Sequence, residues 1–142
     1  MRQVLYDITP VLDTGKNITF LRRMDGSVSF NKTWNEYRSG FGNTEGEVWL
    51  GLEKMHHLTT THALSLRVDM EAWNNATLWS EYSHFSIDSE AENYKLHVSG
   101  YDTTSTGGDS LTKSLNYNNV ADEMYFSTCD NDNDKKATGE YK

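Results

Sequence analysis

The segment Leu64–Met70 alternates strictly, with apolar residues at its even positions and polar residues at its odd positions. Successive side chains of a strand point to opposite faces of a sheet, so this pattern predicts a strand with one buried and one solvated face. Such a strand needs partner strands at its sides and a covering layer on its apolar face. No other segment constrains the fold of the chain as strongly.

Two further segments have the pattern of partner strands. Thr77–Ile87 is the first, and its alternation breaks near Tyr82, as a β-bulge would break it. Tyr94–Val98 alternates again, and Asn74 and Asn75 supply a turn before the first partner. Two or three antiparallel strands with short helices between them predict an α+β fold. We expect a twisted, mainly antiparallel central sheet, short flanking helices and a loop-rich carboxy-terminal region.

Residues 31–38 carry the clearest helix signal. Thr33 is a good N-cap, with Asn31 as an alternative, and Glu36 lies three positions beyond Thr33, which completes a capping box. Gly40 ends the pattern. The aromatic residues that share one face of this helix are Trp34, Tyr37 and Phe41.

The remaining segments give weaker signals. Val48–Leu52 is an apolar run typical of a buried strand, and Met55–Thr60 is compatible with a short helical turn. Residues 1–24 are mixed and indicate only a turn at residues 13–16. From Tyr101 onward the chain is rich in glycine, serine, threonine and asparagine, so we expect mostly loop there. Long loops in compact domains tend to be functional.

Length and charge limit the class of protein. The 142 residues have the size of one domain, which we place at residues 1–142. Thirteen basic residues against 21 acidic ones give a net charge of -8, which disfavours nucleic acid as a partner. No basic amphipathic segment is present and the apolar runs are too short to span a bilayer, so we expect no membrane insertion. The amino terminus lacks the apolar region of a signal peptide.

Cysteine and glycosylation signals point to different compartments. Cys129 is the only cysteine, so no disulfide forms within these residues, which is typical of a cytosolic protein. Sequons at Asn17, Asn31 and Asn75 accept glycans only in a secreted protein, and each can equally be a chance triplet. Composition alone leaves the compartment open.

A series of short sequence blocks occurs in a recognisable order. The blocks are Arg22–Phe30, Trp34–Tyr37, Gly40–Gly42, Gly46–Gly51, Leu66–Asp69, Ala91–Tyr101, Gly108–Leu111, Phe126–Thr128 and Asp130–Asp134. In order and spacing they resemble the fibrinogen-related domain of fibrinogen, ficolins, tachylectins and angiopoietins, over about residues 4–139. The resemblance implies an extracellular recognition domain that is not an enzyme.

The sequence departs from the family pattern toward both ends. In the family, a strand that carries a cysteine precedes the turn that residues 13–15 resemble, and we expect this strand to be missing here. Family members also continue beyond the acidic run with a second cysteine pair and a segment that forms much of the ligand pocket, which we expect this chain to lack. Cys129 matches no family disulfide, so we predict that it either links two chains or is a buried free thiol.

The run from Asp130 to Asp134 is the sharpest chemical signal. Calcium binds six to eight oxygen ligands, which closely spaced carboxylates and backbone carbonyls supply. The resemblance implies side-chain ligands from Asp132 and Asp134 and backbone carbonyl ligands from Lys136 and Thr138. The alternative is an acidic loop that is simply solvated.

The histidine cluster gives a weaker hypothesis. His56, His57 and His62 could suggest a metal site or an acid–base pair, but adjacent residues of a helix do not face together, so surface histidines are favoured. His84 and His97 lie in expected strands beside core positions. No spacing typical of a catalytic triad, a phosphate loop or a zinc site is present, so we expect no enzyme.

The tryptophan residues admit two interpretations, and so does the function. Trp34, Trp49 and Trp73 could form a platform for sugars, but core packing is favoured. The leading functional hypothesis is a calcium-assisted extracellular recognition module for glycans, acetylated groups or protein ligands, lectin-like or innate-immune, acting within an oligomer or larger assembly. The alternatives are a structural or assembly module that has lost the ligand pocket, and a fragment that another chain completes.

Overall fold

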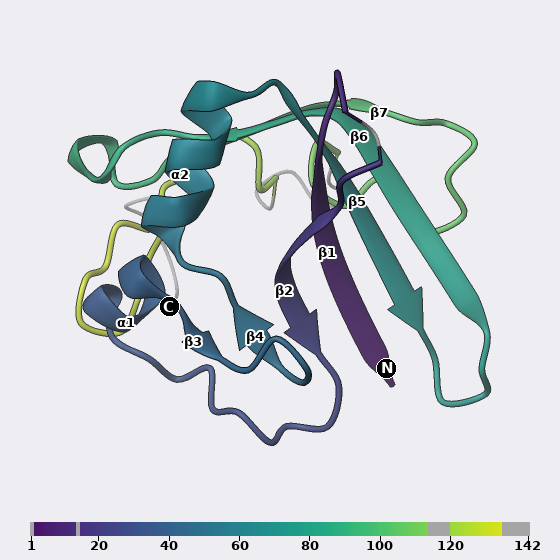
Figure 1. Cartoon of the computed structure of the whole chain (residues 1–142), viewed down its shortest axis with the longest axis horizontal. Coiled ribbons are helices and arrows are strands. Elements are labelled where there is room, and N and C mark those ends of the chain that lie inside the picture. Colours follow the sequence, from purple (N-terminus) through teal and green to yellow (C-terminus); the bar gives the residue numbers. More distant parts are fainter. Residues whose placement is uncertain (1, 14, 114–119, 135–142) are drawn as a thin grey trace, which may run out of the picture.

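A computed structural model of the chain describes residues 2–13, 15–113 and 120–134. Within these ranges one antiparallel sheet has the strand order β3-β4-β2-β1-β5-β6-β7 (Figure 1). The elements are β1 Gln3–Pro10, β2 Ile18–Arg23, α1 Trp34–Ser39, β3 Phe41–Gly42, β4 Val48–Trp49, α2 Leu52–Thr61, β5 Leu64–Glu71, β6 Thr77–Ile87, the 3-10 helix η1 Glu90–Glu92, and β7 Leu96–Tyr101. The α+β prediction is confirmed, although the sheet is larger than the two or three strands that the sequence indicates.

Strand β1 lies at the centre of the sheet, between β2 and β5. Ile8 is fully buried and pairs with Leu66 of β5. The sequence pattern missed β1 and β2 because neither alternates cleanly. Asp7 and Ile8 are both buried although they point to opposite faces, and the register of β1 with β2 shifts at Tyr6/Asp7.

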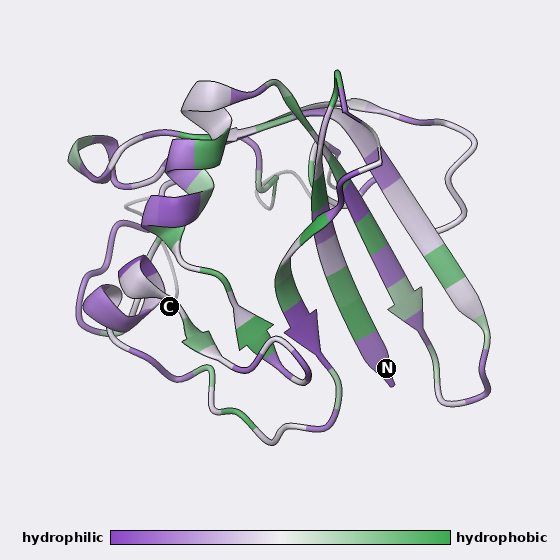
Figure 2. Ribbon diagram, viewed as in Figure 1, coloured by the Kyte–Doolittle hydropathy of each residue, from purple (hydrophilic) through white to green (hydrophobic). Residues whose placement is uncertain are grey.

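The predicted strands β5 and β6 are present with the predicted break in alternation. Figure 2 shows hydrophobic and hydrophilic residues alternating along β5. Leu64 pairs with Phe85 whereas Leu66 pairs with Tyr82, so β6 has one extra residue between these pairs. The extra residue is a bulge that lets Tyr82 and Phe85 both reach the core, where they are 1% and 3% exposed.

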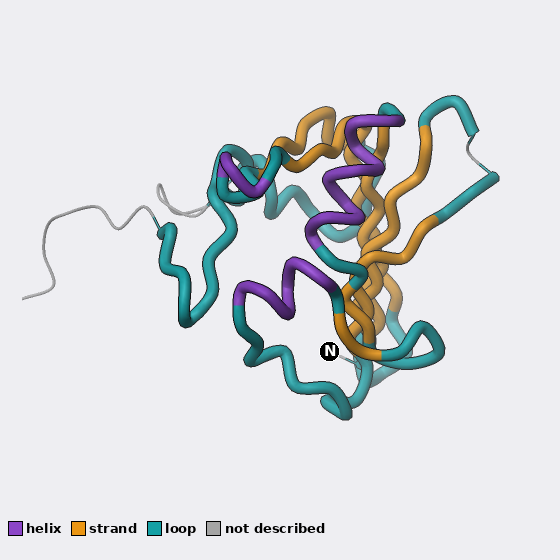
Figure 3. Tube along the Cα trace, turned by 60° about the vertical axis from the view of Figure 1, so that its left-hand side comes forward, coloured by secondary structure: helices purple, strands orange, loops and turns teal. Residues whose placement is uncertain are grey.

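Both α-helices lie on the same side of the sheet (Figure 3). Helix α1 begins directly after Thr33, whose side chain accepts from the Glu36 backbone N–H while the Glu36 carboxylate accepts from the Thr33 N–H at 2.9 Å. The predicted capping box is therefore confirmed. Gly40 ends the helix with φ at 95°, a conformation that favours glycine. Helix α2 is longer than the predicted turn and buries Leu52 and Met55.

The hydrophobic core fills the space between this helix layer and the sheet. Trp34 and Trp49 belong to it at 8% exposure each, so core packing is confirmed for both. The same prediction is wrong for Trp73, which is 74% exposed. Trp73 follows the end of β5 in the turn before β6, where no layer covers it.

A buried carboxylate fixes the turn that follows β2. Glu47 is 1% exposed and accepts backbone hydrogen bonds from Met24, Gly26 and Val28 at 2.8–3.0 Å. Burial alone would raise the pKa of Glu47, but these bonds and the charge of Arg23 outweigh it and lower the pKa to about 2. The carboxylate thus stays ionised inside the fold and orders residues 24–28.

Candidate functional site

The acidic loop, residues 127–134, is tied to the start of helix α1. Asp130 accepts hydrogen bonds from the Thr128 hydroxyl at 2.8 Å and from the Trp34 backbone N–H at 2.9 Å. These two bonds lower the pKa of Asp130. Of the three acidic residues in the run, Asp130 therefore has a structural role.

The loop is shaped by its own hydrogen bonds. Thr128 and Asn131 exchange two backbone bonds, at 3.0 and 3.1 Å. The Asn133 side-chain amide donates to the Phe126 carbonyl at 2.9 Å, which holds the far part of the loop against the core. Asp132 and Asp134 remain exposed, and the Asp134 backbone N–H donates to Asp132 Oδ1 at 3.0 Å.

The exposed carboxylates border a hollow of about 340 Å³. Its lining residues are Ser127, Thr128, Cys129, Asp132 and Asp134. Hard oxygen donors of this kind suit calcium, but a calcium ion needs six to eight ligands. Among the described residues no group of three histidine, cysteine or acidic side chains converges on one point. Lys136 and Thr138 lie outside the described residues, so the calcium site stays a prediction.

Two further hollows continue from the acidic loop toward the sheet. A mixed hollow of about 480 Å³ shares Ser127, Thr128 and Cys129 with the loop. An apolar hollow of about 340 Å³ shares Trp49 and Phe126 with the mixed one. We call these two hollows together the aromatic groove.

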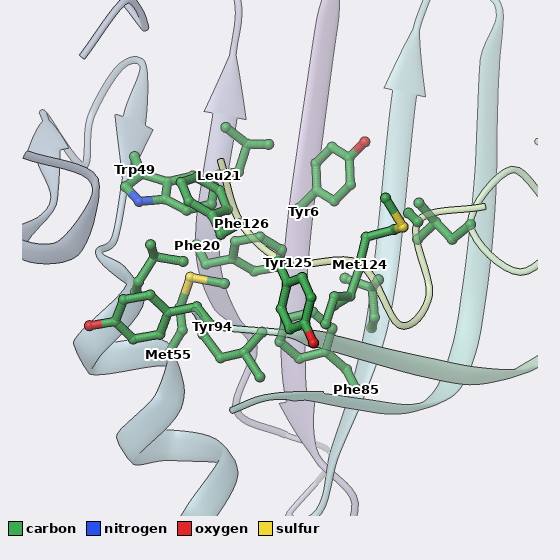
Figure 4. A pocket seen from close by; sticks show the side chains of 16 residues that line it. Tyr6, Phe20, Leu21, Trp49, Met55, Phe85, Tyr94, Met124, Tyr125 and Phe126 are labelled. Carbon is green, nitrogen blue, oxygen red and sulfur yellow. The ribbon is translucent and has the colours of Figure 1, made fainter. Parts of the chain in front are cut away.

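Figure 4 shows the apolar hollow from close by, with side chains from the sheet, helix α2 and the segment 124–126 gathered around it. The Trp49 ring packs against Phe20 edge-on at 6.0 Å and stacks on Phe126 at 5.9 Å, measured between ring centroids. The groove is therefore walled by rings that hold one another in place.

Trp49 and Tyr37 line the groove and Trp34 packs against its residue Phe126, and all three use polar side-chain atoms within the fold. Trp34 Nε1 donates to Glu90 Oε1 at 2.9 Å, and Trp49 Nε1 donates to the Tyr37 carbonyl at 2.8 Å. The Tyr37 hydroxyl donates to the Phe30 carbonyl at 2.6 Å. A ligand in the groove would thus meet apolar ring surface, while polar recognition would come from the acidic loop.

Residues 121–126 lie against β7 and cover one end of the groove. The Leu96 N–H donates to the Met124 carbonyl at 2.9 Å, and the Glu123 N–H donates to the Leu96 carbonyl at 2.8 Å. The Asp122 carboxylate accepts from the Val98 N–H at 2.9 Å. These bonds attach the segment along the free edge of β7.

His97 adds charge to this attachment. Its Nδ1 lies 2.7 Å from Glu123 Oε1 and its Nε2 lies 2.9 Å from Asp88 Oδ2, and Lys95 also pairs with Glu123. The hydrogen bond with Asp88 raises the pKa of His97, burial opposes it, and the bond with Glu123 adds to it. The sequence placed His97 beside the core but gave no sign of this link between β7 and the tail.

The hydrogen-bond partners of His56 and His62 lie outside the acidic loop. His56 Nδ1 is 2.9 Å from the Ile87 carbonyl, and His62 Nδ1 is 2.8 Å from the Thr61 hydroxyl. His57 and His84 are exposed. Among the described residues the structure therefore does not bring the cluster His56, His57 and His62 together with Asp132 and Asp134.

The predicted modification residues are at the surface. Asn17, Asn31 and Asn75 are all exposed, as glycan attachment requires. Cys129 is also exposed, which rules out the alternative of a buried thiol. A disulfide between chains through Cys129 stays a prediction. None of the helices in the described ranges is long and apolar enough to cross a membrane.

Comparison with known proteins gives this geometry a context. Residues 3–140 match the family described as the fibrinogen beta and gamma chains, C-terminal globular domain. Fibroleukin of Bos taurus is 42% identical over 117 residues, which are 82% of this chain and 26% of that protein. Microfibril-associated glycoprotein 4 of Bos taurus is 42% identical over 125 residues, which are 84% of this chain and 46% of that protein. The chain thus spans less than half of these relatives.

Solved structures show the same fold. The fibrinogen-like globe domain of human ANGPTL2 matches with a TM-score of 0.74 and 33% identity, over 95% of this chain and 64% of that one. Lamprey fibrin D-dimer, complexed with the peptide ligand Gly-His-Arg-Pro-amide, matches with a TM-score of 0.75 and 31% identity, over 96% of this chain and 49% of that one. The resemblance drawn from the short blocks is therefore confirmed, and the chain belongs to the fibrinogen C-terminal globular domain family.

Proposed function

We propose that this domain is an extracellular recognition module that binds its ligand where the acidic loop meets the aromatic groove. The observation that carries the proposal is the continuity of the three hollows. Apolar ring surface, a mixed polar surface and two exposed carboxylates follow one another along shared lining residues. A ligand pocket combines these features, with apolar walls and a few polar groups that orient the ligand.

Calcium would order the polar end of this surface. Asp132 and Asp134 would supply side-chain oxygens, and Lys136 and Thr138 would supply backbone carbonyls. The ion would offset the repulsion between the two carboxylates and hold the loop in one shape. Asp130 already accepts a hydrogen bond from the first residue of α1, so it would keep the loop in place with or without the ion.

A peptide or an acetylated glycan is the ligand class that we propose. Support comes from the lamprey fibrin D-dimer, which is complexed with the peptide ligand Gly-His-Arg-Pro-amide and whose structure is similar to this chain. The net charge of -8 and the exposed carboxylates favour a basic or neutral ligand over an acidic one. A role in innate immunity or as a lectin follows from the resemblance to ficolins and tachylectins.

Calcium titration tests the metal part of the proposal. We expect millimolar Ca²⁺ to raise the melting temperature of the wild-type chain by a few degrees, because a ligand of the folded state stabilises it by mass action. The substitutions Asp132→Asn and Asp134→Asn should abolish the rise. Asp13→Asn, at an exposed position outside the loop, is the matched control. An equal rise in all variants would contradict the site.

Ligand binding is tested separately. We expect saturable binding on an array of acetylated glycans or in a titration with Gly-His-Arg-Pro-amide, followed by tryptophan fluorescence because Trp49 lines the groove. The recognition function would be overturned if neither ligand binds and calcium leaves the melting temperature unchanged.

The apolar hollow also favours a second function, assembly with another polypeptide. Among the residues that line it are Tyr6, Leu96 and Met124, which are partly exposed, apolar or aromatic, and suit a protein partner. An assembly module would form a stable complex that buries more than about 1,000 Å². Sedimentation analysis distinguishes the two functions, since a clean monomer that binds glycan or peptide would exclude assembly as the main role.

A further inference from the structure

The hairpin turn between β5 and β6 combines two features that the proposed recognition surface does not use. Trp73 is 74% exposed. Within the described ranges it is the aromatic residue among the exposed large hydrophobic side chains. Asn75, two positions later, is an exposed sequon asparagine with Thr77 at the required position. The exposed Trp73 ring leaves a large apolar face open to contact with another group.

Hydrogen bonds within the turn define the position of Asn75. The Asn75 N–H donates to the Ala72 carbonyl at 3.0 Å, and the Ala72 N–H donates to the Ala76 carbonyl at 2.9 Å. The Asn75 backbone lies in the left-handed region, with φ at 63°. Asn75 Oδ1 accepts from the Arg2 guanidinium at 2.7 Å. Within the described part of the chain Asn75 Nδ2, the atom that a glycan would modify, donates no hydrogen bond.

Arg2 connects Asn75 with a hollow that Trp73 also lines. Arg2, which holds the Asn75 amide oxygen, also lines a hollow of about 330 Å³ together with Trp73. The rest of the lining mixes polar groups such as Arg23 and Asp25 with the apolar side chain of Met24, which is 41% exposed. A sugar ring presents both kinds of surface, because its C–H face is apolar and its rim carries hydroxyl and amide groups.

We propose that an N-linked glycan is attached to Asn75 and that its first N-acetylglucosamine stacks on the Trp73 indole over this hollow. Attachment would follow ordinary sequon chemistry. Asn75 Nδ2 bonds to the anomeric carbon of a lipid-linked oligosaccharide, the bond to the lipid diphosphate breaks, and one amide proton is released. The inference rests on the extracellular location in the proposed function, but it requires neither calcium nor a ligand.

The test uses chains secreted from eukaryotic cells, with Asn17→Gln and Asn31→Gln as the background so that Asn75 is the remaining sequon. Mass spectrometry should find Asn75 occupied. The glycosylated chain should melt about 2–4 °C above the same chain made without glycan, which is the shift that one aromatic stacking contact produces in a domain of this size. An unoccupied Asn75 would overturn the inference.

Enzymatic trimming and substitution of Trp73 separate stacking from a general effect of glycosylation. Trimming the glycan to its first sugar should preserve the shift, whereas complete removal should abolish it. Trp73→Ala should also abolish the shift while Asn75 stays occupied, and Trp73→Phe should retain part of it. A shift that persists in Trp73→Ala would contradict the stacking contact.

The matched control is a chain in which Asn17 is the remaining sequon. Asn17 follows Gly15 and Lys16, so no aromatic residue lies at the corresponding position. We expect its glycosylation to leave the melting temperature nearly unchanged. An equal shift at both sites would likewise overturn a specific role for Trp73. Because these readouts are occupancy and melting temperature, they can fail while calcium or ligand binding succeeds, and the reverse also holds.

Discussion

The sheet, residues 3–101, and the tail, residues 102–113 and 120–134, are held in different ways. Strands of the sheet are joined by continuous backbone ladders and by a shared apolar core. In the tail, strand-like backbone pairing is limited, among the described residues, to one bridge between Thr128 and Asn131. Individual hydrogen bonds attach the tail to the rest of the fold, such as those from the N–H groups of Val98 and Trp34. A change in the sheet should therefore unfold the domain, whereas a change in a tail anchor should release the tail alone.

The largest effect is expected from Phe85→Ala in β6. Phe85 is 3% exposed and stacks on Phe20 with ring centroids 5.5 Å apart. The substitution should lower the free energy of unfolding by about 3–5 kcal/mol, a large share of the roughly 5–15 kcal/mol typical of a domain. Urea unfolding followed by circular dichroism measures the change. Leu78→Ala on the same strand, where Leu78 is 45% exposed, should change it by less than about 1 kcal/mol.

A smaller effect is expected from Glu47→Gln, which changes a polar anchor inside the sheet region. The amide can still accept some of the backbone bonds from residues 24–28, but it loses the charge that faces Arg23. We expect a loss of about 1.5–3 kcal/mol in the free energy of unfolding. Glu45→Gln, at an exposed position two residues earlier, should be nearly neutral. Equal losses would show that the burial of Glu47 is unimportant.

The same residue predicts sensitivity to acid. Because the folded-state pKa of Glu47 is lowered from 4.5 to about 2, its contribution to stability is complete above 4.5 and is lost as the pH falls toward 2. Glu47→Gln should therefore flatten the fall in melting temperature over this range. A variant with the same acid profile as the wild type would contradict the assignment.

The smallest effect is expected in the tail, from the titration of His97. Its raised pKa means that the bonds to Asp88 and Glu123 contribute fully below the ordinary value of 6.5 and weaken as the pH rises through the raised pKa. Protection of the Glu123 backbone amide against hydrogen exchange should fall across this range, while the amides of β5 stay protected. His97→Gln should remove the pH dependence, and His84→Gln, which changes an exposed residue of β6, should preserve it. Loss of protection in β5 as well would show that the sheet and the tail open together as one unit.

Local sequence rules predicted the parts of the fold that local physics determines. The alternation of β5 and the Thr33 capping box needed no knowledge of distant residues. Strands β1 and β2 were missed because most of their residues are half-buried and a register shift at Tyr6/Asp7 interrupts the alternation, so no clean period of two remains in the sequence.

The candidate site was predicted only in part, because long-range contacts assign its residues their roles. Asp130, Asp132 and Asp134 look alike in sequence, yet Asp130 differs because it meets the Trp34 N–H, 96 positions away. Glu47 had a usable signal, since it is a charged residue directly before the apolar run Val48–Leu52. Trp73 was misassigned because its residue type favours burial and the sequence does not show that its turn projects beyond the core.

The central place of β1 has a consequence for how the domain is made. Among the described strands β1 is synthesised first and can pair with β2 as soon as that strand is made, but its other edge waits until β5 has been synthesised, after both α-helices. Until then β1 has an open edge, a state that invites aggregation. Removal of β1 would accordingly split the sheet through its middle, whereas removal of β3 or β7 would only shorten the sheet at an edge.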